Sequence, residues 1–151
     1  MPNHVDPERE QFDEFKELPR DKPILMLNLL RFRKHAAYED GREATGAEAY
    51  AAYGKEIGPI FRRVGGEIVW RGKPELMVIG PRAEYWDEIF VARYPTADAF
   101  LQMVTDPEYR IAVKHRQAAI GIDAAHRPFD DLVELDRFCN RIGVVVVDRA
   151  L

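Results

Sequence analysis

Two apolar runs, each followed by helical patterning, constrain the fold of this chain more than any other feature. The first is ILMLNLLRF at 24–32, and the second is WDEIFVARY at 86–94. Both have the length and the apolar or alternating pattern of a strand. A strand and helix order that recurs along one chain predicts a sheet covered by helices rather than a helical bundle.

A long helix is predicted over residues 45–64, after the first of these strands. Thr45 precedes Glu48 by three residues, which is the spacing of a capping box, and apolar residues then recur at helical spacing. Gly58 and Pro59 fall inside this pattern, and proline removes a backbone donor. We therefore expect the helix to kink or break there.

The strand predicted at 86–94 is followed by two helical segments. Thr96 is an N-cap residue for a helix through Val104. Asp106 and Pro107 then combine an acidic cap with proline at the first helical position, which predicts a restart that runs to about Ile120.

The remaining segments complete the order of elements. A short amphipathic helix is predicted at 7–18, a strand at 67–72 (EIVWRG), and a short extra strand at 75–80 (ELMVIG). Further strands are expected near 129–136 (FDDLVELD) and in the valine-rich tail at 141–151. The order is β-α-β-β-α-β with an extra N-terminal helix and a C-terminal strand. It predicts an α+β ferredoxin-like sandwich with an antiparallel sheet and both helices on one face.

Size and composition suit one soluble domain. The chain has 151 residues and a formal charge of -4 with both signs interspersed, so neither nucleic acid nor a membrane surface is an expected partner. No secretory signal or membrane-spanning run is found, and the single cysteine, Cys139, fits a reducing compartment. We expect a cytoplasmic protein with one domain over 1–151. Because the uncovered sheet face would be apolar, we also expect a homodimer.

The segments MLNLLRF, WRG and WDEIFVARYPTADAFLQMVTDPEYRIAVKHR together resemble the DUF1330 family. The most specific part is RYPTADAFLQMVTDPEY, and the resemblance covers about 24–135, the core of the domain. The family belongs to the dimeric α/β-barrel superfamily, so the resemblance implies a dimeric barrel built from two such sandwiches. That superfamily includes cofactor-independent monooxygenases, muconolactone isomerases and haem-binding proteins, so the resemblance does not select a chemistry.

Asn28 is an amide inside the apolar run at 24–32. An unpartnered buried amide costs about 1–3 kcal/mol, so it must form a hydrogen bond. Two interpretations are open: the amide binds a ligand in a cleft between sheet and helices, or it bonds a neighbouring backbone group or a water.

Three residues of the last helical segment are candidate catalytic groups. Tyr109 and Arg116 share one helical face above small residues, where they could hold an anionic or enol oxygen. The alternative for Arg116 is an ion pair with Asp87 or Glu88. His115 diverges from Arg116 by about 100° and is either a base or a surface histidine.

Aromatic rings could supply an apolar wall to the same cleft. Trp70 and Tyr53 are the candidate substrate-binding rings, although most rings are expected in the core or in a dimer interface. Metal and cofactor sites are not predicted, because the four histidines have no ligand spacing and no glycine-rich phosphate loop is present. The chain also lacks serine, which excludes a serine nucleophile.

The sequence therefore leaves three classes of function open. The first is a cofactor-independent oxygenase or isomerase that acts on an aromatic or enol-type metabolite. The second is a noncatalytic dimer that binds a small molecule, and the third is a structural dimer. A pocket with Asn28 and Arg116 pointing inward would exclude the third class.

Overall fold

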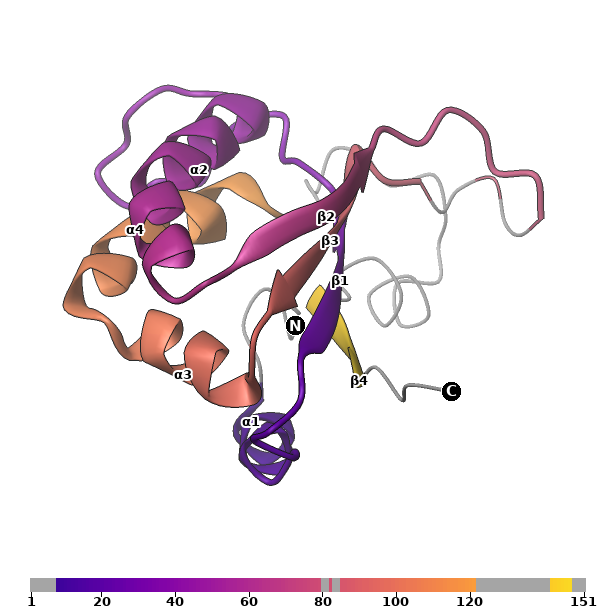
Figure 1. Ribbon diagram of the computed structural model, residues 1–151. Helices are drawn as coiled ribbons and strands as arrows, with labels where there is room; N and C mark the ends of the chain where they lie inside the picture. The colour runs from indigo at the N-terminus through magenta and orange to yellow at the C-terminus, as the bar shows by residue number, and fades with distance from the viewer. Residues whose placement is uncertain (1–7, 80–81, 83–84, 122–141, 148–151) are drawn as a thin grey trace.

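The protein has an α+β fold. A computed structural model describes residues 8–79, 82, 85–121 and 142–147. The elements are, in chain order, α1 (Arg9–Lys16), β1 (Ile24–Leu30), α2 (Gly46–Arg63), β2 (Glu67–Gly72), β3 (Glu88–Tyr94), α3 (Ala97–Thr105), α4 (Pro107–Ala119) and β4 (Ile142–Val147). Helices α2, α3 and α4 gather on one side of the sheet (Figure 1).

The sheet is antiparallel and has the strand order β2-β3-β1-β4. Consecutive strand residues point to opposite faces, so one alternate set faces the helices. In β1 and β3 this set supplies much of the core, and its buried members are Ile24, Met26, Leu30, Phe90, Ala92 and Tyr94. The predicted alternation of both strands therefore matches the burial pattern.

Helix α2 begins where the capping-box pattern predicts. The Thr45 side chain accepts from the Glu48 backbone N–H, and the Glu48 carboxylate accepts in return from the Thr45 N–H. Of the two outcomes expected at Pro59, a kink or a break, the break does not occur, because α2 is one helix of 18 residues that includes this proline. Pro59 is exposed, while Ile60 beside it is buried in the core, and this packing holds the helix together across the missing backbone hydrogen bond.

The junction between α3 and α4 also follows the predicted caps. The Thr96 side chain accepts from the Ala99 N–H at the start of α3. Asp106 ends α3, and its carboxylate accepts from the Glu108 N–H at the start of α4. The helical segment therefore bends at Asp106 instead of continuing straight, which places α4 beside α2.

Three strand predictions had different outcomes. No strand forms within the described part of the extra segment, 75–79, where Leu76, Val78 and Ile79 are exposed. The strand expected at 129–136 lies outside the described residues. The valine-rich tail does form a strand, β4, which pairs with β1 at the edge of the sheet.

Candidate functional site

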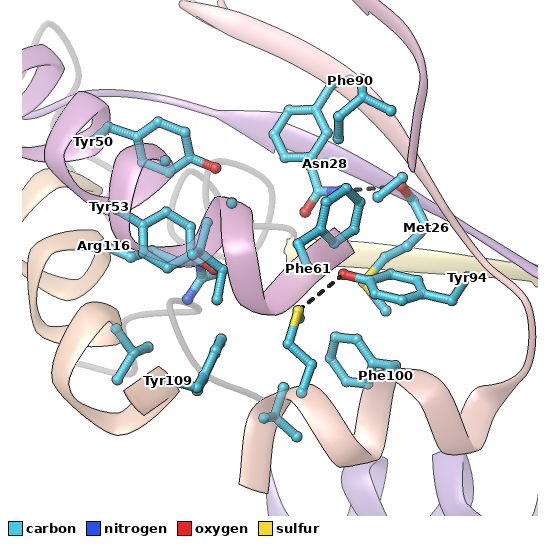
Figure 2. A pocket seen from close by; sticks show the side chains of 18 of the residues that line it. Met26, Asn28, Tyr50, Tyr53, Phe61, Phe90, Tyr94, Phe100, Tyr109 and Arg116 are labelled. Atoms are coloured by element: carbon cyan, nitrogen blue, oxygen red, sulfur yellow. Dashed lines mark hydrogen bonds between the residues drawn. The ribbon is translucent and has the colours of Figure 1, made fainter. Parts of the chain in front are cut away.

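A cavity of about 770 Å³ lies between the sheet and the helices that cover it. Its lining residues belong to all four helices and to strands β1, β2 and β3. A volume of this size fits a drug-sized organic molecule. Figure 2 shows side chains from sheet and helices converging on the same space.

Eight aromatic rings line the cavity. The lining rings are Phe12, Tyr50, Tyr53, Phe61, Phe90, Tyr94, Phe100 and Tyr109. Tyr94 lies edge-on between Phe61, at 5.4 Å between ring centroids, and Phe100, at 5.3 Å. Edge-to-face packing of this kind fixes ring orientation, so the wall is rigid on this side.

The phenols of the wall remain neutral at ordinary pH. Burial raises the pKa values of Tyr50, Tyr53 and Tyr94 above that of a free phenol, and the positive charge of Arg116 opposes each rise only in part. These three hydroxyls are therefore hydrogen-bond donors as well as acceptors. The Tyr94 hydroxyl lies 3.9 Å from the sulfur of Met103.

The nitrogen end of the Asn28 side-chain amide forms a hydrogen bond within its own strand. Its Nδ2 donates to the backbone oxygen of Met26 at 3.0 Å. Its Oδ1 accepts no hydrogen bond from any residue that the structure describes, and it points into the cavity (Figure 2). The structure thus supports both interpretations of Asn28, one for each end of the amide.

Arg116 lies on the same cavity as Asn28, and its side chain is buried, with 8% of the residue exposed. The carboxylates expected as alternative partners are engaged elsewhere. Asp87 accepts from the Phe32 backbone N–H at 2.7 Å, and Glu88 pairs with Arg71 at 3.0 Å. Tyr109 and Tyr53 also line the cavity, so four of the six candidate site residues meet at one place.

His115 does not belong to this group, and its possible role as a base stays a prediction. Its Nδ1 lies 2.5 Å from the hydroxyl oxygen of Tyr38, and its Nε2 lies 3.3 Å from a carboxylate oxygen of Glu56. It is not among the lining residues. The side chains of neighbouring helical residues point about 100° apart, so Arg116 and His115 lie on different sides of α4.

Trp70 also lies outside the lining, with 54% of its surface exposed. A register shift between Ile68 and Trp70 places Trp70 opposite Val91, which points away from the helices. Ile68 and Arg71 line the cavity instead. Trp70 therefore lies away from this cavity, its role as a substrate-binding ring stays a prediction, and strand alternation alone could not locate this bulge.

Two glycines of α2 line the cavity, and sequence reasoning missed them. These are Gly54 and Gly58. A Cβ at Gly54 would have no neighbouring atom within 4 Å, so the space beside it is open. The signal was a pair of glycines four residues apart on the helix face that carries Tyr50 and Ile57.

Within the described residues, no three His, Cys, Asp or Glu side chains gather as a metal site would require. The helices in the same part of the chain include none long and apolar enough to cross a membrane.

Comparison with known proteins identifies the family. Residues 41–125 match the family described as "Domain of unknown function (DUF1330)". The crystal structure of the methylated RPA0582 protein is 57% identical with a TM-score of 0.77, and the match covers 80% of this chain and 89% of that chain. A crystal structure of the RPA0582 protein of unknown function from Rhodopseudomonas palustris is 56% identical with a TM-score of 0.75, covering 79% and 90%. No curated protein matches. On sequence and structure together, the chain belongs to the DUF1330 family.

Proposed function

We propose that the protein binds a small, mostly apolar organic molecule in the cavity between sheet and helices. The observation that supports this is a space of about 770 Å³ whose wall is mainly apolar, includes eight aromatic rings and carries a few inward polar atoms. Sites for small organic ligands have this composition, because apolar contact supplies affinity and a few polar atoms set orientation. The free Oδ1 of Asn28 and the phenols of Tyr50 and Tyr53 are such atoms.

Binding is better supported than catalysis. The candidate base, His115, is held by Tyr38 and Glu56 and is not part of the lining. An oxygenase or isomerase acting on an aromatic or enol-type metabolite is the second candidate. The pairing of Tyr109 with Arg116 on the cavity favours it, since both could polarise an enol oxygen. A bound metabolite recovered unchanged after long incubation supports binding, and recovery with a changed mass supports catalysis.

We also propose that the protein works as a homodimer in which two ferredoxin-like sandwiches stack through their uncovered sheet faces. The strand order β2-β3-β1-β4, with helices α2, α3 and α4 on one side, supports the sandwich. Exposed apolar residues on β2, Val69 and Trp70, support the contact. Large exposed apolar side chains on a sheet are typical of a surface that another chain covers.

Binding can be tested with phenylnaphthylamine, a neutral two-ring probe that fluoresces in apolar surroundings. We expect the wild-type protein to bind it and Gly54→Trp to bind it at least about tenfold more weakly, because the indole occupies the open space beside residue 54. Gly54→Ala is the matched control, since one methyl group leaves most of the cavity empty. Equal binding by the wild type and Gly54→Trp would place the probe elsewhere and overturn the proposal.

A further inference from the structure

Two polar atoms lie on opposite walls of the cavity. Asn28 contributes its Oδ1 from strand β1, and Tyr50 contributes its hydroxyl from helix α2. Figure 2 shows both atoms turned toward the same space. Neither atom forms a hydrogen bond with any residue that the structure describes. Polar groups that are withdrawn from water are normally hydrogen-bonded, so this pair is left for a molecule that enters the cavity.

The orientation of the Asn28 amide is fixed by its own strand. Its Nδ2 donates to the backbone oxygen of Met26 at 3.0 Å. A backbone carbonyl only accepts, so the nitrogen end of the amide must face it. The oxygen end then faces the cavity, where it can only accept. A ligand at this point must therefore supply a hydrogen-bond donor.

The Tyr50 hydroxyl has the complementary role. Its ring lies 5.3 Å from the ring of Phe32 and 5.4 Å from the ring of Tyr53, measured between centroids, and these contacts restrict its rotation. Burial raises the pKa of the Tyr50 phenol, so the hydroxyl keeps its proton and can donate it to a ligand oxygen. The two walls thus present a fixed acceptor and a donor to one space.

One kind of chemical group satisfies both atoms at once. A hydroxyl oxygen carries one hydrogen to donate and lone pairs that accept, so a single ligand hydroxyl can bond to Asn28 and to Tyr50. A carboxylate or a ketone only accepts, and it would leave Oδ1 of Asn28 without a donor. A buried group that loses its partner in this way costs affinity, which lets such a site reject molecules that lack the hydroxyl.

The wall beside this pair is apolar. Phe90 is the direct partner of Asn28 across the β1–β3 ladder, so its ring stands next to the amide on the same face of the sheet. Phe61 and Phe100 also line the cavity. Apolar contact therefore begins immediately beside the polar pair, which suits a hydroxyl attached directly to an apolar skeleton and not one on a polar chain.

We infer that the ligand is a hydroxylated apolar molecule, an alcohol or a phenol, whose hydroxyl donates to Oδ1 of Asn28 and accepts from the hydroxyl of Tyr50. This inference rests on the proposed binding function and specifies the class of ligand for the same cavity.

The test uses three compounds with one ring skeleton to displace phenylnaphthylamine. Naphthol donates and accepts, methoxynaphthalene only accepts, and naphthalene does neither. From the wild-type protein we expect naphthol to displace the probe at about fivefold lower concentration than either of the other two, because it alone satisfies both polar atoms.

Two substitutions assign this preference to the two walls. Asn28→Leu removes the acceptor and should bring naphthol and methoxynaphthalene within about twofold of each other. Tyr50→Phe keeps the ring and removes the donor, so it should weaken naphthol by about threefold or more while naphthalene changes by less than about twofold. Tyr38→Phe is the matched control, because it removes a tyrosine hydroxyl outside the lining, and it should leave all three affinities unchanged.

The outcomes separate this inference from the function on which it rests. Equal displacement by naphthol and methoxynaphthalene in the wild type would overturn the hydroxyl inference while binding itself stands. A naphthol preference that survives both Asn28→Leu and Tyr50→Phe would overturn it as well. Failure of phenylnaphthylamine to bind the wild type would instead overturn the proposed function, and the inference with it.

Discussion

The hydroxyl of Tyr38 lies 2.5 Å from Nδ1 of His115, and the other ring nitrogen of His115 faces Glu56. This cluster joins three parts of the molecule: the segment before α2, helix α2 and helix α4. His115 is therefore a structural cross-link between the two long helices and the segment beside them. The structure gives it no contact with the cavity.

Replacing His115 by alanine should lower stability and spare the cavity. We expect a loss of about 1–3 kcal/mol in the free energy of unfolding, because the change removes two polar contacts and leaves the partly buried Tyr38 hydroxyl without its partner. Urea denaturation measures the loss, and Tyr38→Phe is the control, since it removes the same hydroxyl bond from the other side. A variant that unfolds like the wild type but loses probe binding would show that His115 acts at the site.

Replacing Asn28 by leucine distinguishes the structural role of its Nδ2 from a ligand-binding role of its Oδ1. The lost bond from Nδ2 to Met26 is local and only partly buried, so we expect a cost of about 1 kcal/mol or less. The lost Oδ1 should reduce the preference for a ligand that carries a hydroxyl donor. Displacement of phenylnaphthylamine by naphthol and by naphthalene measures this, and the wild type should favour naphthol by about fivefold. A large loss of stability with an unchanged naphthol preference would assign Asn28 a structural role alone.

Two glycine-to-alanine substitutions in α2 should have opposite effects on stability. A Cβ at Gly46 would contact the backbone of Arg33 and Ala119, with 2.6 Å to the Ala119 oxygen. Backbone cannot move aside cheaply, so Gly46→Ala should cost about 3 kcal/mol. Gly54→Ala meets open space and should stabilise by about 1 kcal/mol, because alanine favours the helix. Thermal or urea unfolding checks both, and equal effects at the two positions would contradict the packing described.

Stability should fall in alkaline solution because of the buried phenols. The pKa values of Tyr50 and Tyr53 are raised in the folded protein, so the folded state favours the neutral phenol. This contribution is complete below the unfolded pKa of about 10 and is lost as the pH rises toward the folded value. Each of these tyrosines should remove up to about 1.4 kcal/mol per pH unit above about 10. Urea denaturation between about pH 9 and 11 measures the slope, which Tyr53→Phe should reduce; an unchanged slope would show that Tyr53 ionises equally in both states.

If the proposed dimer forms, lysine substitutions at two exposed apolar positions, Trp70 and Ile111, should affect the mass in solution differently. Trp70→Lys should reduce the mass in solution from dimer to monomer, because it places a charge on the uncovered sheet face. Ile111→Lys, at an exposed apolar position on α4, should leave the mass unchanged. Light scattering at micromolar concentration distinguishes them, and a monomeric wild type would end the dimer proposal.

Local signals predicted most of the fold. The caps at Thr45, Thr96 and Asp106 are short-range contacts between residues two or three apart, so the sequence contains both partners of each. The absence of a break at Pro59 was harder to predict, because the core that Ile60 packs into is built from residues far away in sequence. Propensity is a weak guide where tertiary contacts compensate for a lost hydrogen bond.

The cavity was harder to predict than the elements around it. The alternation of β1 and the face of α4 brought Asn28 and Arg116 together, because both rest on regular periodicity. Trp70 lies outside the lining because one bulge reverses the faces of a strand, and His115 lies outside it because one helical step rotates a side chain away.

The N-terminal helix has a consequence for the time a ligand stays bound. Helix α1 supplies Arg9 and Phe12 to the cavity, and it is attached by Phe15, whose ring lies 5.1 Å from Phe100. An ion pair between Arg20 and Asp98 adds a second attachment just beyond the helix. A ligand enclosed partly by α1 can leave more quickly when these two contacts loosen. The residence time of a ligand should thus report the docking of α1, even where the equilibrium affinity is determined deeper in the molecule.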